Sequence, residues 1–357
     1  MKARMLVVPF LAALVTTASD ADAASWEDKL NKLYPAAKAE GEIIVNSARH
    51  EELGGKAGLA KFNKRFPGIK LTISGIAGSK LASVVIAESK AGRVSIDLFR
   101  SDPSRAEPLA KRGLLEKLDL ATLTDQQVRT FFDSSFVKLS DHITNFVYNT
   151  DLVKEADKPK SYEDLLNPKW KQRIALDARG GQISHLLAKK VWDEKKFWDY
   201  VKALQGQSPI WTARNTEAMA KITSGEAAIG TGSYAAIENL KQRGAPVEFL
   251  FLSPALSQVR GMAILKGAPH PNASKLFLGW LMSPEGLEAR DKLAVGVIEP
   301  GTVAYQKVKA ANAEIMAEDK IENILDRLAV QKKVTNEWGV YKTLRKERRK
   351  RRKKKKE

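Results

Sequence analysis

The chain has 357 residues, no cysteine, 43% hydrophobic residues and a formal net charge of +18. The lack of cysteine excludes a disulfide framework and a lipid-modified N-terminal cysteine. The length is typical of two domains, and the apolar content is sufficient for packed cores. From Lys342 to Glu357 there are twelve Lys and Arg against two Glu, so this segment carries +10 of the charge and leaves +8 for the rest.

Residues 1–23 have the pattern of a secretory signal peptide. A basic start precedes an apolar run from Met5 to Val15, and small residues follow up to Ala23. A membrane anchor is the alternative, but the run is shorter than the roughly 20 apolar residues that a span needs, and Pro9 interrupts it. We therefore predict cleavage after Ala23 and a location in the periplasm.

Strand and helix patterns alternate from residue 24 onward. Strands are expected at 42–46, 70–74 and 96–99, and helices at 25–40, 51–66, 80–91 and 103–113. Ser79 and Asp102 stand at helix starts, where their side chains are expected to act as N-caps. This alternation predicts an α/β fold, in which ligands bind beyond the carboxyl ends of the strands.

Extended segments at 143–148 and 247–252 are candidate crossings between two lobes, and a further strand is expected at 261–265. Other strands are expected at 170–177 and 227–231, with helices at 183–191, 194–204, 216–224 and 234–243. We therefore expect a first lobe from residues 24–146 and about 260–310. The second lobe is expected from residues 147–259 and about 311–340.

The basic tail, residues 341–357, is a low-complexity run of like charges, and such runs are typical of disordered segments. We therefore expect disorder there. Two interpretations remain open: a solvated extension without a role, or a contact with acidic lipid headgroups or polyanions. Nucleic-acid binding is not expected, because the chain is predicted to be exported and the tail has no interleaved aromatic residues.

Common catalytic motifs are absent from the sequence. There is no cysteine nucleophile, no G-x-S-x-G elbow and no H-E-x-x-H motif, since the histidine at position 50 and its two following glutamates lack a second histidine. No acid and base pair with supporting spacing was found. We therefore expect a binding protein rather than an enzyme.

Six segments are informative together: AAKAEGEIIVNSA, FPGIKLTISGIAGSKLASVVIAESKAGRVSIDLF, YNTDLV, SYEDLLNPKWKQRIAL, ITSGEAAIG and SPEGLEARDKLA. In this order and spacing the chain resembles bacterial extracellular solute-binding proteins of the ferric-ion-binding type, the soluble receptors of ABC importers. The resemblance covers most of the chain from Leu30 to Gly301. It implies a two-lobed type II periplasmic-binding fold, with mixed sheets flanked by helices and with hinge strands between lobes that close on the ligand.

The resemblance also implies a partner and a ligand. We expect a monomer that delivers a small ligand to an ABC permease in the inner membrane, without an obligatory cofactor. Iron-binding members place a His after the first strand, an acid after the third and a Tyr pair in the second lobe. Here His50, Asp102 and Tyr234 match, whereas Ser233 stands where the first Tyr is expected. Ferric ion, the transported ligand in this interpretation, prefers anionic oxygen and would need a synergistic anion or water to complete its shell.

The same loops also predict an anion site, because Arg can hold a carboxylate or phosphonate through two parallel hydrogen bonds. A helix start at Ser79 adds backbone N–H groups. The basic candidates are Arg49, Lys80, Arg100, Arg179, Arg214 and Arg260. The polar candidates are Ser47, Ser79, Thr231 and Ser233. Ferric iron is the first interpretation, and a small anionic organic solute is the alternative.

Overall fold

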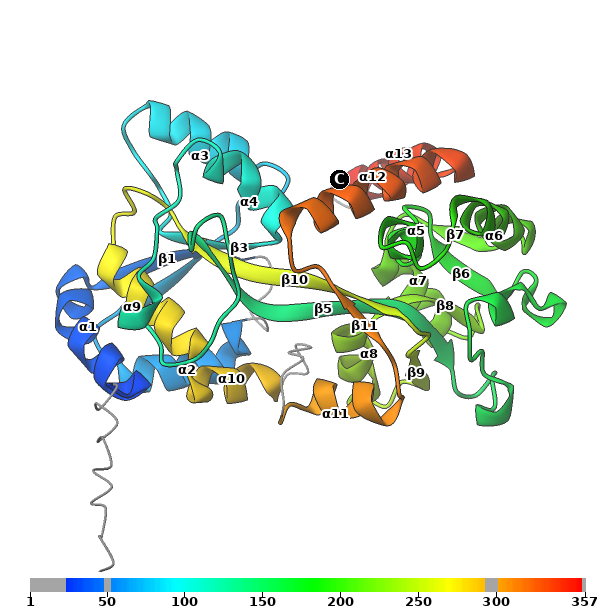
Figure 1. The fold of residues 1–357 in the computed structure, drawn as a ribbon, viewed down its shortest axis with the longest axis horizontal. Coiled ribbons are helices and arrows are strands. Elements are labelled where there is room, and N and C mark those ends of the chain that lie inside the picture. Colours follow the sequence, from blue (N-terminus) through cyan, green and yellow to red (C-terminus); the bar gives the residue numbers. More distant parts are fainter. Residues whose placement is uncertain (1–23, 48–52, 293–300, 355–357) are drawn as a thin grey trace, which may run out of the picture.

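Two long strands, β5 (Phe136–Asn149) and β10 (Ala255–Ile264), join the two halves of the molecule (Figure 1). The computed structural model describes residues 24–47, 53–292 and 301–354 of the chain. β5 and β10 pair in antiparallel fashion, and their register shifts between Arg260 and Gly261. A Cβ atom at Gly261 would collide with the Val137 carbonyl oxygen, so this bulge requires glycine.

The remaining strands extend this pair on both sides. They are β1 (Glu42–Asn46), β2 (Lys70–Ser74), β3 (Leu98–Ser101), β4 (Thr130–Phe131), β6 (Ile174–Asp177), β7 (Ile210–Thr212), β8 (Ile229–Ser233), β9 (Val247–Leu250) and β11 (Ile315–Ala317). Within the described residues they form one sheet in the order β2-β1-β3-β10-β5-β8-β6-β7, while β4 and β9 pair with β5 and β11 pairs with β10. The sheet is mixed, because β1–β3 and β6–β8 are parallel units joined through antiparallel strands.

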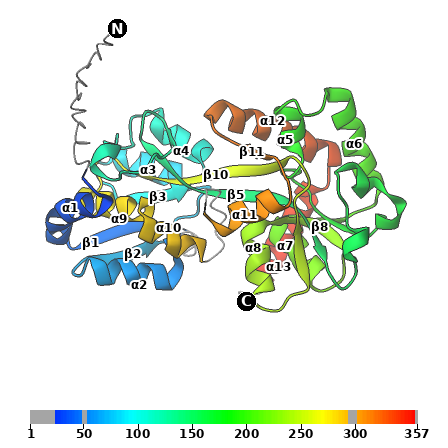
Figure 2. The same ribbon diagram turned by 60° about the horizontal axis from the view of Figure 1, so that its bottom comes forward.

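Helices cover both faces of the sheet (Figure 2). They are α1 (Trp26–Glu40), α2 (Gly55–Arg65), α3 (Leu81–Lys90), α4 (Pro103–Ala110), α5 (Ser184–Ala188), α6 (Glu194–Gly206), α7 (Asn215–Thr223), α8 (Tyr234–Lys241), α9 (Pro271–Met282), α10 (Pro284–Asp291), α11 (Val303–Ala310), α12 (Ile321–Trp338) and α13 (Tyr341–Lys354). Short 3-10 turns lie at Leu120–Thr122, Glu155–Asp157, Glu163–Leu166 and Pro168–Trp170. Within the described residues, none of the helices combines the length and the apolar character that crossing a membrane requires.

Each half has two apolar clusters, one on either face of its part of the sheet. Successive residues of β10 show the alternation, because Met262 packs with α1, α2 and α9 while Ala263 packs with α3 and α4. In the second half, Phe146 of β5 packs with α5 and α6, and Val147 packs with α7 and α8. Because both faces are covered, residues on alternating faces of β5 and β10 are buried or half-buried, the polar ones included.

The packing moves several predicted boundaries. β5 passes from the first half to the second between Leu139 and Ile143, rather than at residue 146. Residues 247–252 were predicted to cross between lobes, but β9 pairs with the second-half end of β5, and β10 makes the crossing. α11 was assigned to the first lobe, yet Ala304 and Val308 pack in the second half.

Helix α12 belongs to both halves, although residues 311–340 were predicted in the second lobe. Ile324 near its start packs with α4 of the first half, whereas Val334 and Trp338 near its end pack in the second half. In Figure 1 this orange helix lies above β5 and β10, between α4 and α5. A strand pattern or a helix pattern gives no information on which of two neighbouring cores it faces, so this bridge could not be read from the sequence.

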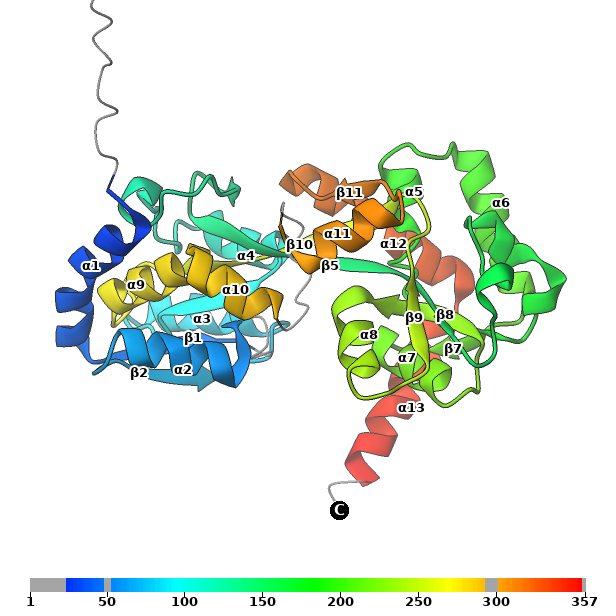
Figure 3. The same cartoon turned by 90° about the horizontal axis from the view of Figure 1, so that it is seen from below.

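The prediction of disorder in residues 341–357 is wrong for residues 341–354, which form α13. Arg and Lys are good helix formers, so local propensity favours the helix despite its like charges. Arg348 of α13 also forms an ion pair of 2.8 Å with Glu217 of α7. Figure 3 shows α13 projecting from the second half toward the C-terminus. Residues 1–23, the predicted signal peptide, lie outside the described residues.

Candidate functional site

A cavity of about 340 Å³ lies between the two halves. The first half contributes the start of α4, and the second half contributes the last residue of β6, the loop that follows it and the start of α7. The middle of β5, the middle of β10 and α12 complete the wall. The lining consists of Asp102, Ser104, Arg105, His142, Thr144, Asp177, Arg179, Gly181, Gln182, Asn215, Gln258, Arg260, Arg327, Leu328 and Gln331.

The chemistry of this lining is polar and mostly basic. Four arginines and two aspartates are present, together with four side-chain amides and one aliphatic residue, Leu328. Arginine guanidinium groups present several N–H donors in a fixed plane, whereas amides both donate and accept. Such a wall is suited to a small anion that carries further hydrogen-bonding groups, and it is unsuited to an apolar ligand.

Asp102 forms the first-half wall. It caps α4, accepting a hydrogen bond from the Arg105 amide at 3.3 Å and another from the Ser104 hydroxyl, and it pairs with the Arg105 guanidinium at 3.1 Å. Burial opposes ionisation, but the charge of Arg260 and the Ser104 hydrogen bond hold the pKa of the Asp102 carboxyl below its usual value. Burial lowers the pKa of Arg260, and the charge of Asp102 opposes that shift. The acid and the arginine therefore stabilise each other's charge across the cavity.

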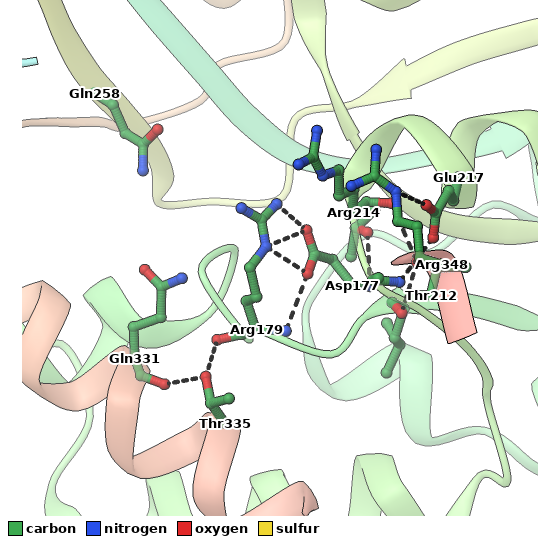
Figure 4. A network of polar contacts seen from close by, with 12 residues as sticks. Asp177, Arg179, Thr212, Arg214, Glu217, Gln258, Gln331, Thr335 and Arg348 are labelled. Carbon is green, nitrogen blue, oxygen red and sulfur yellow. Dashed lines mark hydrogen bonds and ion pairs between the residues drawn. The ribbon is translucent and has the colours of Figure 1, made fainter. Parts of the chain in front are cut away.

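Asp177 and Arg179 form the second-half wall (Figure 4). Asp177 ends β6 and is buried, and its amide donates to the Thr231 hydroxyl of β8 at 3.1 Å. The Arg179 Nε lies 2.9 Å and 3.1 Å from the two Asp177 carboxylate oxygens, and its Nη2 also donates to the carboxylate. This paired geometry fixes the guanidinium at the edge of the cavity. It also leaves Nη1 as the nitrogen that is not engaged by Asp177 in the described structure.

Helix α12 lies against this wall because Gly180 permits a close approach. Gly180 has a φ of +68°, and a Cβ atom there would collide with Val334 of α12. The Thr335 hydroxyl donates to the Arg179 carbonyl oxygen at 2.9 Å. Next to the cavity, Arg327 donates to Gln331 at 2.9 Å and pairs with the buried Glu318. α12 thereby brings Arg327 and Gln331 to the cavity wall.

Two amide groups in the lining are buried without a hydrogen-bond partner among the described residues. They are the Nε2 of Gln182, a residue that is 2% exposed, and the Oδ1 of Asn215. A buried polar group left without a partner costs about 1–3 kcal/mol. One is a donor and the other an acceptor, so a ligand with both functions would relieve both costs.

Three of the predicted site residues meet in this cavity: Asp102, Arg179 and Arg260. Thr231 acts indirectly, because it accepts the Asp177 amide hydrogen bond from behind the wall. Ser47, Ser79, Arg100, Ser233 and Tyr234 do not line it, and Arg214 lines a different cavity. Arg49 and His50 lie outside the described residues.

One local prediction needs correction. Ser79 is exposed in a turn, and the N-cap of α3 is Lys80, without a side-chain cap hydrogen bond, so Ser79 is not the N-cap that was predicted. Ser233 precedes α8 and is buried, also without a side-chain cap hydrogen bond. α3 therefore begins at Leu81, one residue later than predicted, whereas α8 begins at Tyr234 as predicted.

Tyr234 lies in an apolar cluster rather than in the cavity. Its ring is 1% exposed and packs against Phe249 at 5.7 Å and Phe251 at 5.9 Å, measured between ring centroids. Its hydroxyl has no hydrogen-bond partner among the described residues, and burial raises its pKa. Phenolate, the form that a ferric ion needs, is therefore disfavoured at this position. The described residues also contain no cluster of three or more His, Cys, Asp and Glu that could hold a metal ion.

Sequence reasoning missed most of the other residues that line the cavity. Asp177 and Gln182 flank the loop after a strand that was predicted, and Asn215 starts a predicted helix, so strand-end placement could have found them. Gln258, Arg327 and Gln331 had no such signal. Their position depends on the crossing of β10 and on the bridge that α12 makes.

Comparisons with known proteins agree with this architecture. A family model described as bacterial extracellular solute-binding protein matches residues 57–318. The Fe(3+)-binding periplasmic protein of Serratia marcescens is 27% identical over 269 residues, which is 71% of this chain and 77% of that protein.

Two solved structures show the fold. Iron-bound HitA from Pseudomonas aeruginosa has a TM-score of 0.64 at 19% identity, covering 84% of this chain and 99% of that chain. The binding protein AgtB from A. tumefaciens R10, in complex with agropinic acid, has a TM-score of 0.58 at 20% identity, covering 84% and 98%. The predicted two-lobed α/β periplasmic-binding fold is thus confirmed.

Proposed function

Because the chain belongs to the bacterial extracellular solute-binding protein family, we propose that it is the periplasmic receptor of an ABC importer for a small organic anion. Family and fold are those of binding proteins rather than enzymes. The observation that carries the ligand assignment is the cavity between the halves, with four arginines and two buried amide atoms that have no hydrogen-bond partner among the described residues. A carboxylate or phosphonate that bears hydroxyl or amine groups is the class of solute that this lining favours.

Both halves contact the same cavity, which supports capture by closure. Asp102 and Arg105 come from the first half, and Arg179 and Asn215 come from the second. A ligand that bridges them gains contacts that exist only when the halves are close, and only such differential contacts shift an open–closed equilibrium. The closed receptor would then dock on a permease in the inner membrane and release the solute there.

Ferric iron with a synergistic anion is the second candidate, and the name of the Serratia relative favours it. Against it stands the burial of Tyr234 in an apolar cluster. With Ser233 at the neighbouring position, the described part of the second half offers no phenolate at the cavity. The arginines could still hold the anion that accompanies a metal.

The test is a thermal-shift titration of the chain from residue 24 onward. The probes are a panel of hydroxy- and amino-carboxylates, phosphonates, ferric citrate, and sodium citrate as the matched metal-free control. Binding to the folded state at 100 times Kd adds about 2.7 kcal/mol, so a true ligand raises Tm clearly. We expect a shift with an organic anion, lost in Gln182→Leu and retained in Tyr234→Phe.

The opposite pattern would overturn this assignment. It consists of a shift with ferric citrate that sodium citrate does not give, together with a visible tyrosinate–iron absorption that Tyr234→Phe abolishes. In that case the second half would have to rearrange to expose Tyr234, and iron would be the ligand.

A further inference from the structure

A second cavity, of about 180 Å³, lies between α13 and the loop that leads into α7. It shares no lining residue with the cavity between the halves. Its lining consists of Ala213, Arg214, Tyr341, Arg345, Arg348 and Arg349. Four of these six residues are arginines and none is acidic. Its volume is several times the roughly 30 Å³ that one water molecule occupies in the liquid.

Glu217 of α7 holds this arrangement together. Its carboxylate accepts the Ala213 amide at 3.0 Å and pairs with the Arg348 Nε at 2.8 Å. Figure 4 shows Glu217 between the start of α7 and the Arg348 side chain, with Arg214 beside it. The contact is partly shielded, since the Arg348 side chain is 26% exposed. α13 is therefore docked on the second half, and Glu217 pairs with one of the four arginines of the lining, Arg348.

The surplus of positive charge has a chemical consequence. Guanidinium groups that share one cavity repel each other, and an anion placed among them turns the repulsion into attraction. Arg is suited to phosphate in particular, because its planar N–H groups match two phosphate oxygens at once. The arginines come from two elements that are about 130 residues apart in the sequence, so the cavity is formed by tertiary packing rather than by helix α13 alone.

We propose that this cavity binds a phosphate group, held by Arg214, Arg345 and Arg349, with Arg348 anchored by Glu217. The family model matches residues 57–318, whereas α13 begins at Tyr341. Because the two cavities share no lining residue, the proposed site does not depend on which solute the main cavity takes. The phosphate has two sources with the same chemistry: a soluble phosphate or phosphate monoester, and the headgroup of an anionic phospholipid.

The test uses the chain from residue 24 to its end, in phosphate-free buffer with about 0.15 M NaCl, where the Debye length is about 8 Å and long-range attraction is screened. Inorganic phosphate and glycerol 1-phosphate are titrated by calorimetry. In a separate arm, vesicles of phosphatidylglycerol in phosphatidylcholine are compared with pure phosphatidylcholine vesicles by co-sedimentation. Both arms are run on wild type and on two variants of equal charge.

The site variant is Arg345→Gln/Arg349→Gln, and the matched control is Lys346→Gln/Lys350→Gln. All four residues are exposed on α13, but only the arginines line the cavity. Glutamine is a good helix former, so each pair removes two charges and keeps the helix. We expect the site variant to weaken binding about tenfold or more, as for lost hydrogen bonds to a charged group, and the control to change it less than about twofold.

The arms distinguish the sources. Calorimetric binding of the soluble probes identifies a soluble phosphate as the ligand, and sedimentation with phosphatidylglycerol vesicles alone identifies the lipid headgroup. Equal weakening in the two variants would overturn the site, because it would show attraction by net charge alone. Binding to none of the probes would also overturn it. Neither result bears on the solute of the main cavity, which the thermal-shift panel tests separately.

Discussion

The two halves build the main cavity in different ways. The first half offers the capped start of one helix, where Asp102 and Arg105 are held mainly by contacts within α4. The second half offers residues that hydrogen bonds connect to other elements. Asp177 accepts from the Arg179 side chain and its amide donates to β8, while the Arg179 carbonyl oxygen accepts from α12. The second-half wall is therefore fixed before a ligand arrives. We infer that it provides most of the ligand affinity, and that the first half adds contacts on closure.

If the second half provides most of the ligand affinity, the substitution of Arg179 should lower that affinity most. Arg179→Gln removes the fixed guanidinium and leaves the buried Asp177 carboxylate without its partner. Loss of charge-assisted hydrogen bonds costs about 1.5–3 kcal/mol, so affinity for the organic anion should fall about 10- to 100-fold in isothermal titration. Arg173→Gln, an exposed arginine outside the cavity, is the control. An unchanged Kd in Arg179→Gln would mean that the second half is not the main recognition surface.

A substitution at Gly180 tests whether α12 must lie close to the loop after β6. Gly180→Ala places a Cβ against Val334 at a backbone φ of +68°, so we expect a loss of about 1–3 kcal/mol of unfolding free energy. Gly181→Ala is the matched control, because its nearest neighbour is the flexible Gln331 side chain at 3.3 Å. Urea denaturation measures both. Equal stability of the two variants would contradict a tightly packed α12.

His185 gives a pH dependence to the second half. It is fully buried, its Nε2 lies 2.8 Å from the Pro254 carbonyl oxygen, and burial lowers its pKa to about 4, with Arg327 also disfavouring the charged form. The unfolded chain, with a His pKa of about 6.5, binds more protons between these values. Stability is therefore complete above pH 6.5 and declines as the pH falls toward 4, by about 2 kcal/mol at pH 5.

The measurement is the unfolding free energy at pH 7 and pH 5 in wild type and in His185→Asn. The variant is expected to be less stable at neutral pH, because the contact with the Pro254 carbonyl changes. Its decline between the two pH values should nevertheless be smaller than that of wild type. An equal decline would assign the pH dependence to other groups.

The substitution of Asp102 should change ligand affinity least. The direction of the change distinguishes an organic anion from ferric iron. Asp102→Asn keeps a capping side chain at the start of α4 but removes a negative charge that faces the ligand. Affinity for an organic anion should rise a few-fold, because one partly exposed charge pair contributes roughly 0.2–1 kcal/mol. Affinity for ferric iron should fall instead. Asp119→Asn, which changes a cap away from the cavity, is the control.

Local patterns were sufficient for many of the elements. The helix at 25–40, the strands at 42–46 and 70–74, and the Asp102 cap with Pro103 at the first helical position were all predicted and are confirmed. Each depends on residues that are close in the chain, so side-chain chemistry and backbone preference decide it. Asp102 and Arg179 were found for the same reason, since they follow strand ends, whereas Arg260 lies in the middle of β10.

What the sequence by itself determined was the alternation of strands and helices, the resemblance to a receptor family and the basic character of the loops. Only the tertiary structure decided that Tyr234 lies in the core, that α12 bridges both halves and that α13 is a docked helix. These features depend on contacts between residues far apart in the chain. A tyrosine after a strand has the same local pattern whether its ring turns to a cavity or to Phe249 and Phe251, and the packing of those rings determined its position.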